Sequence, residues 1–313
     1  MKYRKFGKSD MNVSSICLGT WVFGGDFWGG ADDKESIAVV REAVRKGVNF
    51  IDTAPAYGCG HSEEVIGEAL KGIKEKVFIA TKCGLEIKGK LVRSDLSPGF
   101  VRSDVEGSLK RLGRDTIDLI QCHWPDPKTP LKDTLGELEK LVLEGKVRYI
   151  GVSNFGKGLL SEALGVLPVV SDQMQYSLFN RDIEKDILNF SVDKGIAIMA
   201  YGPLGGGVLT GKYDKRPSFP KTDARSIFYT YYKEPFWSKS RELVGCLDRI
   251  AAARNVTSAE VAINWVLSHE AVTSCIVGCR NLKQLEVNAA STEWKLTQEE
   301  LEEIESEYRR IFG

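Results

Sequence analysis

Residues 50–58 read FIDTAPAYG. A short apolar run enters this stretch, and proline and glycine interrupt the chain after it, which is typical of a buried strand that leads into a turn. The strand would carry the carboxylate of Asp52 to its end, and the turn would hold the phenol of Tyr57. Because polar groups are costly to bury without partners, we expect this strand end to face a polar site.

Three later stretches have the same design, an apolar run that ends in polar residues: VFIATK (77–82), IDLIQCH (117–123) and VRYIGVSN (147–154). The first ends in Lys82, the second in His123 and the third in Ser153 and Asn154. Four strands that end in this way suggest that their ends converge on one site.

Apolar runs and amphipathic helical patterns alternate along the whole chain. Besides the four strands above, the sequence predicts strands at residues 11–18, 169–176, 196–201 and 274–277. It predicts helices at residues 33–46, 63–71, 97–112, 131–143, 158–164, 182–194, 240–254, 258–268, 282–290 and 298–310. A long aromatic and basic segment, residues 212–237, follows the seventh strand.

Eight strands, each with a following helix, predict an α/β fold, a (β/α)8 TIM barrel with a long loop after strand 7 and extra C-terminal helices. We expect residues 1–313 to form one domain. A doubly wound sheet is the alternative, but the first strand lacks the G-x-G-x-x-G turn of that fold. The polar ends also come from most of the strands. In a barrel they would meet at the C-terminal rim, where barrel enzymes place their sites.

Composition limits the possible partners. Lys+Arg and Asp+Glu both number 43, so no net charge attracts nucleic acid or an anionic membrane. No apolar stretch approaches the ~20 residues of a membrane span, and the N-terminus does not resemble a signal peptide. The 7 cysteines, an odd number, suit reduced thiols and a cytoplasmic location. Cys275 and Cys279 are read as a coincidental pair, and no metal site is expected. The sequence does not determine the oligomeric state; a monomer is the expectation.

The motifs around the strand ends resemble those of the aldo-keto reductases. Asp52 and Tyr57 in DTAxxYG, Lys82 in ATK and His123 in HWP match the family's catalytic tetrad in order and context, and GVSNF at residues 151–155 matches a further signature. The resemblance extends over nearly the whole chain. It includes the bacterial branch of inositol-operon and general-stress reductases and also the potassium-channel β-subunits. It implies reduction of a small-molecule carbonyl with a nicotinamide cofactor.

The chemistry of these four side chains supports that reading. A carbonyl that accepts hydride needs a proton donor and stabilisation of the developing alkoxide. We assign Tyr57 as the general acid, Lys82 as the cation that strengthens this acid, Asp52 as the partner of Lys82, and His123 as the group that orients the carbonyl. A single buried Asp or Lys is more often part of a structural ion pair; the set of four favours catalysis.

The resemblance also implies a cofactor site across the barrel mouth. Ser153, Asn154 and Gln175 would hold the carboxamide, Tyr201 would stack on the nicotinamide, and Lys212 and Arg225 would close over the phosphates. The expected cofactor-binding residues are Thr20, Trp21, Ser153, Asn154, Gln175, Tyr201, Gly202, Pro203, Leu204, Gly205, Gly206, Lys212, Arg225, Gly278, Arg280, Gln284 and Asn288. Val287 departs from the family, which commonly has an adenine-contacting glutamate there.

The expected cofactor is NADP(H). Arg280 follows the eighth strand at the adenosine end, and its planar guanidinium suits a phosphate. Glu286 is the only nearby acid in the sequence, and helical geometry places it away from Gln284. The alternative is that Arg280 lies free in solvent at the rim.

The substrate is expected to lie against Trp21, Tyr57, His123 and Trp124, and the aromatic segment 219–237 could complete the pocket or merely pack on the rim. The sequence does not identify this substrate. Two other functions remain open. One is a cofactor-sensing module with slow turnover, and the other is an aldolase that forms a Schiff base on Lys82.

Overall fold

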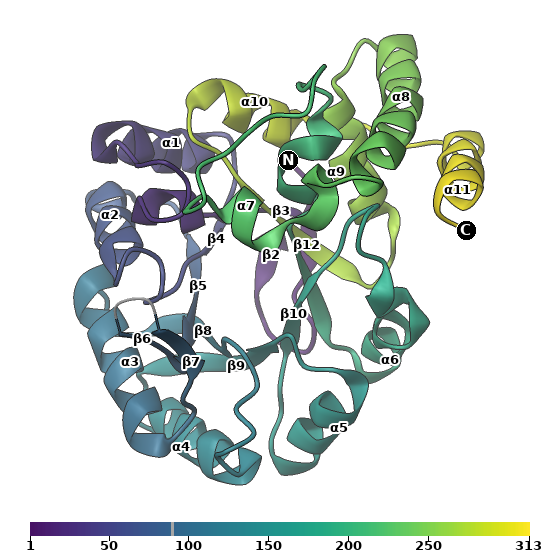
Figure 1. Ribbon diagram of the computed structural model, residues 1–313. Helices are drawn as coiled ribbons and strands as arrows, with labels where there is room; N and C mark the ends of the chain where they lie inside the picture. The colour runs from purple at the N-terminus through teal and green to yellow at the C-terminus, as the bar shows by residue number, and fades with distance from the viewer. Residues whose placement is uncertain (89–90) are drawn as a thin grey trace.

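Eight parallel strands close into a barrel in the computed structural model, which describes residues 1–88 and 91–313 (Figure 1). The strands are β3 (Ile16–Gly19), β4 (Phe50–Asp52), β5 (Phe78–Cys83), β8 (Ile117–Cys122), β9 (Val147–Ser153), β10 (Ser171–Gln175), β11 (Ala197–Tyr201) and β12 (Val272–Gly278). They lie in this order around the barrel, and β12 pairs with β3 to close it. This confirms the predicted (β/α)8 barrel.

Most of the strands are largely apolar because both of their faces are covered; β10, which reads SDQMQ, is the exception. Every residue of β5 and β8 is buried. Phe6, Phe50 and Phe78 belong to one buried cluster with residues of the strands, and this cluster includes Met11 and Val13 from the N-terminal segment. The barrel is therefore a packed core, and the polar side chains that face one another gather at one end of the strands.

The helices form the outer layer (Figure 1). They are α1 (Asp33–Arg45), α2 (His61–Leu70), α3 (Pro98–Leu112), α4 (Leu131–Leu143), α5 (Lys157–Val166), α6 (Ile187–Lys194), α7 (Ala224–Phe228), α8 (Phe236–Arg254), α9 (Ser258–Ser268), α10 (Leu282–Ala290) and α11 (Gln298–Phe312). Short 3-10 turns are η1 (Trp21–Gly24), η2 (Asp182–Lys185), η3 (Gly205–Thr210) and η4 (Thr230–Tyr232). The predicted long segment after the seventh strand, residues 212–237, is confirmed: it follows η3 and contains α7 and η4.

Some predicted boundaries were wrong. The strand expected at residues 11–18 is two strands: β2 (Asn12–Ser14) pairs antiparallel with β1 (Tyr3–Lys5), and only β3 enters the barrel. The helix expected at residues 182–194 breaks at Asp186, whose φ of −154° is not helical. The hairpin of β6 (Leu85–Lys88) and β7 (Leu91–Ser94) was not predicted.

The second helix was predicted at residues 63–71, with Ser62 as its first polar residue outside the helix. Instead α2 begins at His61, and the Ser62 hydroxyl donates to the backbone oxygen of Thr20. A hydroxyl with a tertiary partner has no need to cap a helix, which sequence pattern alone does not reveal.

Strand register places polar residues side by side at one end of the barrel. Gly19 is opposite Asp52, Lys82 is opposite Gln121, and Ser153 is opposite Gln173. The convergence of strand ends that the sequence suggested therefore follows from parallel pairing in register.

Within residues 1–88 and 91–313, no helix has both the length and the apolar character needed to cross a membrane.

One buried carboxyl group lies outside this convergence. Asp172 on β10 is fully buried, and no described residue makes a well-formed hydrogen bond to either oxygen. Burial raises the pKa of Asp172 well above its usual value, and the backbone N–H of Phe155 offsets this only in part. Between the unfolded pKa and the folded pKa of Asp172, the carboxyl group is ionised in the unfolded chain and protonated in the folded protein. Folding in this pH range therefore takes up a proton.

We expect Asp172→Asn to stabilise the protein above about pH 4, where the unfolded carboxyl group ionises. Because the folded pKa is raised, the parent loses stability as pH rises from the unfolded pKa toward the folded one, and the amide has no such loss. Each unit by which folding raises this pKa is worth about 1.4 kcal/mol, so the gain at neutral pH should be of that order or larger. Melting curves between acidic and neutral pH test this; a gain that does not depend on pH would contradict the assignment.

Candidate active site

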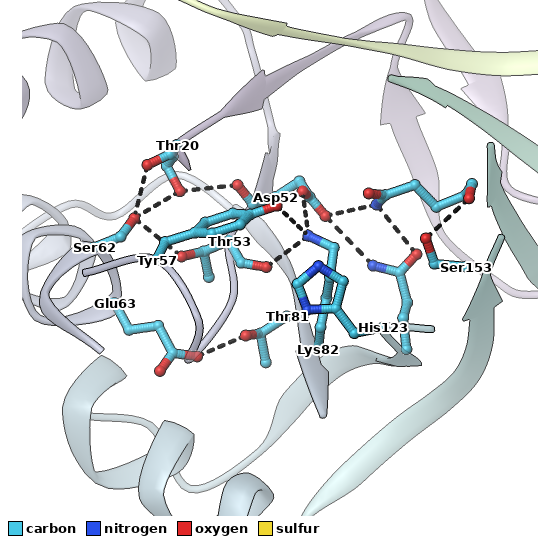
Figure 2. Close-up of polar contacts among 12 residues, drawn as sticks. Thr20, Asp52, Thr53, Tyr57, Ser62, Glu63, Thr81, Lys82, His123 and Ser153 are labelled. Carbon is cyan, nitrogen blue, oxygen red and sulfur yellow. Dashed lines mark hydrogen bonds and ion pairs between the residues drawn. The ribbon is translucent and has the colours of Figure 1, made fainter. Parts of the chain in front are cut away.

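Lys82 is the centre of the polar cluster at the strand ends (Figure 2). Its ammonium group donates to Asp52 Oδ1 at 2.6 Å, to the backbone oxygen of Thr53 at 2.9 Å and to the Tyr57 hydroxyl at 3.1 Å. The Lys82 side chain is 1% exposed and that of Asp52 is 3% exposed. All three N–H donors of the lysine are therefore used, and its orientation is set by one short stretch, the end of β4 and the turn that follows it.

The charge on Lys82 is maintained by Asp52. Burial lowers the pKa of a lysine, but the Asp52 carboxylate and the Tyr57 oxygen outweigh burial, so the pKa of Lys82 is raised. Lys82 is thus a cation at neutral pH, which agrees with the pairing expected from the sequence.

The pKa of the Tyr57 phenol is set by burial and by two charged neighbours. Burial raises the pKa of Tyr57 above its usual value near 10, the Lys82 cation lowers it, and the Asp52 carboxylate raises it again. The sequence argument held that Lys82 strengthens this acid. Lys82 does act in that direction, but burial outweighs it in the protein without a bound ligand. Tyr57 therefore carries its proton at neutral pH.

The His123 ring stands edge-on to the Tyr57 ring, with centroids 6.1 Å apart and an interplanar angle of 83°. Burial and the Lys82 cation hold the pKa of His123 well below its usual value, so the imidazole is neutral and has one N–H to donate. No described residue forms a hydrogen bond with either ring nitrogen. The ring is available to a ligand beside Tyr57.

Buried hydroxyl groups support the turn that carries Tyr57 (Figure 2). Thr53 donates to the Ser62 hydroxyl at 3.1 Å, and Thr20 donates to the backbone oxygen of Asp52 at 2.9 Å. The hydroxyl of Thr20, which the resemblance placed among cofactor-binding residues, is thus engaged within the protein.

Two glutamines that the sequence argument did not assign complete the shell of Asp52. Gln173 Nε2 donates to Asp52 Oδ2 at 2.8 Å, and Gln121 Nε2 donates to the same oxygen at 3.3 Å. A signal was present in the sequence: Gln121 lies two residues before His123, so alternation along a strand places both on one face.

The residues expected to hold a carboxamide lie next to His123. Asn154 Nδ2 donates to the backbone oxygen of His123 at 3.2 Å and to the Ser153 hydroxyl at 3.0 Å. The Tyr201 hydroxyl donates to Asn154 Oδ1 at 2.9 Å. Gln175 pairs in register with Tyr201, but its Oε1 accepts from Asn180, which is outside this group. The structure therefore brings together Ser153, Asn154 and Tyr201.

The glycine-rich turn after β11 has the backbone that the sequence predicts. Gly202, Gly205 and Gly206 have φ values of 68°, 54° and 66°, a region that favours glycine. Pro203 and Leu204 lie between them. The Tyr232 hydroxyl donates to the backbone oxygen of Gly206 at 2.9 Å, so the long segment after β11 packs on this turn.

A cluster of cations lies where that segment meets the loop after β3. Arg225 pairs with Asp223 at 2.6 Å, and its guanidinium lies 4.0 Å from the centroid of the Phe219 ring. Arg280 donates to the backbone oxygen of Trp28. Burial and the neighbouring Arg225 lower the pKa of Arg280, while Asp223 raises it. Like charges have thus been brought close together.

A second acid, Asp223, lies near Arg280 in the structure. Glu286 was the only nearby acid in the sequence, but Asp223 acts on Arg280 from the long segment. Asp223 is paired with Arg225. Within residues 1–88 and 91–313, no carboxylate lies within salt-bridge distance of Arg280. Glu286 is exposed, as expected.

The remaining predicted residues at this end frame Arg280. Gln284 Oε1 accepts from the backbone N–H of Arg280 at 2.9 Å, and Asn288 Nδ2 donates to the Gly278 oxygen at 3.5 Å. Lys212 is exposed, and its ammonium lies 4.9 Å from the centroid of the Tyr213 ring. Arg225 reaches the same residue, because its Nη1 donates to the Tyr213 hydroxyl at 3.4 Å.

Aromatic rings cover the Tyr57 phenol. Trp21 stacks on Tyr57 with centroids 6.0 Å apart, and Phe228 from α7 lies 5.8 Å from Trp21. Phe27, which the sequence argument did not name, lies 6.2 Å from Phe228. Trp124 is 44% exposed. In the part of the chain described, no cluster of three metal-binding side chains occurs.

Comparisons with known proteins agree with this architecture. Aldo-keto reductase YhdN of Bacillus subtilis (strain 168) is 37% identical over 307 residues, 97% of this chain and 92% of that protein. Aldo-keto reductase yakc [NADP(+)] of Schizosaccharomyces pombe (strain 972 / ATCC 24843) is 34% identical over 309 residues, 96% of this chain and 89% of that protein. The glycerol dehydrogenase AKR11B4 from Gluconobacter oxydans is similar in structure, with a TM-score of 0.92 and 37% identity over 99% of this chain and 96% of that one. The model of the Aldo/keto reductase family matches residues 15–309, and the chain therefore belongs to this family.

Proposed function

We propose that this protein is an NADPH-dependent reductase that converts aldehyde or ketone carbonyls into alcohols, with Tyr57 as the proton donor. The observation that carries the proposal is the arrangement of Tyr57, Lys82 and Asp52, in which a protonated phenol accepts a hydrogen bond from a buried, charge-paired lysine. The phenol oxygen is used as an acceptor, so its own proton is free to pass to a carbonyl oxygen.

Each side chain then has one task. Tyr57 gives its proton to the carbonyl oxygen, and the Lys82 cation stabilises the phenolate that remains. The neutral His123 ring donates a hydrogen bond to the same carbonyl oxygen and so orients it. Trp21 covers the Tyr57 ring and keeps water from the reacting groups.

A bound reduced nicotinamide would supply the hydride, which no side chain can donate. Ser153 and Asn154 would hold its carboxamide, Tyr201 would stack on its ring, and the glycine turn at residues 202–206 would follow its pyrophosphate. The residues fit this group: Arg280 is a cation without a salt bridge in the described residues, and it would pair with the ribose phosphate.

The raised pKa of Lys82 argues against the aldolase alternative, because a Schiff base forms only from a neutral amine.

Steady-state assays with a panel of aldehydes, dicarbonyls and polyols, run with NADPH and NADH, test the proposal. The panel includes glycerol and glyceraldehyde, because one relative is named a glycerol dehydrogenase. Tight cofactor binding without turnover of any compound would favour the sensing module, and borohydride trapping of substrate on Lys82 would favour the aldolase.

We expect the parent enzyme to prefer NADPH, and Arg280→Ala to reduce that preference mainly through KM for NADPH. A charge-assisted hydrogen bond of about 1.5–3 kcal/mol corresponds to roughly ten- to a hundredfold in affinity. KM for NADH should hardly change. Glu286→Gln is the matched control, since this exposed residue is not expected to touch the cofactor. Equal use of both cofactors by the parent would refute the role of Arg280.

A further inference from the structure

The second oxygen of Asp52 is bound by side chains other than the lysine. Oδ1 accepts from Lys82, whereas Oδ2 accepts from Gln173 at 2.8 Å and from Gln121 at 3.3 Å. Gln121 is 0% exposed and Gln173 is 4% exposed. A buried carboxylate oxygen without donors would be strongly destabilising. The two amides supply the hydrogen bonds that water would supply to an exposed carboxylate.

The two amides are also bound to each other, and this determines their orientation. Gln173 Nε2 donates its second hydrogen to Gln121 Oε1 at 3.3 Å. Rotating the Gln121 amide by half a turn would place its oxygen against the carboxylate and its N–H groups against those of Gln173. Because a carboxylate only accepts hydrogen bonds, the triangle of Asp52, Gln121 and Gln173 is satisfied by a single arrangement.

The barrel is shaped to hold Gln121 in this position. Gln121 pairs in register with Lys82 on one side and with Gly151 on the other. A Cβ atom at position 151 would lie 2.3 Å from the Ser171 hydroxyl and 3.2 Å from the Gln121 side chain. The absence of a side chain at Gly151 thus leaves room for the amide beside Asp52.

We propose that Gln121, together with Gln173, is a positioning residue that holds the Asp52 carboxylate against Lys82 and weakens its electrostatic effect on the Tyr57 phenol. This rests on the proposed function, in which Tyr57 is the proton donor. Asp52 makes the phenol a weaker acid. Amide dipoles that point their N–H groups at the carboxylate oppose this effect, so the pair keeps the acid stronger than Asp52 alone would allow.

A test by pH must account for every titratable group near this carboxylate. These are Cys17, Tyr57, Lys82, His123, Asp172, Tyr201 and Cys275. Burial raises the pKa of both thiols and of Tyr201, and His123 is already neutral, so none of these changes charge between about pH 5 and pH 8. Asp172 is present in every variant, so comparison with the parent removes its contribution.

The decisive variant is Gln121→Glu. A protonated carboxyl group has nearly the shape of the amide, can donate to Asp52 Oδ2 and can accept from Gln173. Two adjacent carboxyl groups share one proton, and one of the two ionisations moves to a strongly raised pKa. We therefore expect nearly parental kcat/KM for reduction near pH 5 and a reversible fall, relative to the parent, of about tenfold or more toward pH 8.

Stability should follow the same sign in this variant. Because the shared proton has a raised pKa in the folded state, the variant keeps its stability below the unfolded glutamate pKa of about 4.3 and loses it as the pH rises. The melting temperature of Gln121→Glu should therefore fall relative to the parent from acidic to neutral pH. This readout does not need turnover.

Two further variants complete the design. Gln298→Glu makes the same chemical change at an exposed position of α11 that also donates to a carboxylate, that of Glu302. Because solvent screens exposed charges, this variant should follow the parent closely at every pH. Gln121→Met retains the size of the side chain but removes the donor. We expect it to lose about ten- to a hundredfold in kcat/KM at every pH in this range, the factor for one hydrogen bond to a charged group, with unchanged cofactor affinity measured by fluorescence titration.

The outcomes distinguish the positioning role of Gln121 from the proposed reductase function. Melting and activity profiles of Gln121→Glu that run parallel to those of the parent would overturn the positioning role, as would parental kcat/KM in Gln121→Met. A loss of cofactor affinity that accounts for the whole loss of activity would also overturn it. If the parent reduces no carbonyl but Gln121→Glu shows the pH-dependent melting, the proposed function fails while the binding of Asp52 by Gln121 stands.

Discussion

Tyr57→Phe is expected to abolish carbonyl reduction while leaving the protein folded and able to bind its cofactor. The substitution removes one oxygen, the atom that lies 3.1 Å from the Lys82 ammonium and that carries the transferable proton. One positioned acid contributes about 10²–10⁴ in rate, so kcat should fall by at least the lower figure. The remaining groups, Lys82 and His123, can polarise a carbonyl but do not replace the proton donor.

The measurement is kcat in an assay limited by chemistry, together with cofactor affinity by fluorescence titration. A variant that retained more than half of the parental kcat would show that another group donates the proton. The pH dependence gives a second check. Because burial raises the pKa of Tyr57 above its usual value near 10, reduction by the parent should not lose its acid anywhere in the neutral range.

Asp52→Asn is expected to lower stability and activity together. Asp52 and Lys82 form a buried pair at 2.6 Å, and removal of one partner of such a pair commonly costs about 3–5 kcal/mol. The amide keeps the shape of the carboxylate but leaves the ammonium buried without a counter-charge. Gln121 and Gln173 both donate to Oδ2 in the parent. If the amide nitrogen of the variant took the place of Oδ2, its N–H groups would face those of the two glutamines.

The pH dependence of this loss has a defined sign. Asp52 raises the pKa of Lys82, so the pair stabilises the fold below the unfolded lysine pKa of about 10.4, and this contribution disappears as the pH rises through the folded pKa. The difference in the free energy of unfolding between the parent and Asp52→Asn should therefore be largest at neutral pH and should shrink in strongly alkaline solution.

Glu42→Gln provides the matched control for this experiment. Glu42 pairs with Arg45, whose side chain is 72% exposed, and exposed pairs contribute about 0–1 kcal/mol. Denaturation curves of both variants at neutral pH decide the question. If Asp52→Asn melted like the parent and had the same pH–rate profile, Asp52 and Lys82 would not act as a buried pair.

Much of the fold, and the polar residues at the strand ends of the site, could be predicted because both depend on local sequence pattern. Apolar runs that end in Asp52, Lys82, His123 and Ser153 required strands whose ends are polar, and alternation with helices required parallel pairing. Parallel strands in one closed barrel bring their C-terminal ends to one rim. The convergence of the tetrad therefore followed from the sequence before any contact was known.

Other features depended on contacts between segments that are distant in the sequence. The break at Asp186 and the N-terminal hairpin of β1 and β2 have no strong local signal. Asp223 became the neighbour of Arg280 only because the long segment folds back across the barrel mouth. The net rise in the pKa of Tyr57 also needed the structure, because burial is a property of packing and outweighs the charge of Lys82.

The sequence by itself thus determined which strands carry polar ends, and hence the barrel, its rim and the four residues Asp52, Tyr57, Lys82 and His123. Only the tertiary structure decided what binds the far side of Asp52. Gln121 and Gln173 come from β8 and β10, strands that are not neighbours in the barrel, and they meet at one oxygen because register and the missing side chain at Gly151 leave room there. A periodic pattern indicates which face a side chain occupies, whereas its partner across a barrel depends on closure and register, which no single stretch encodes.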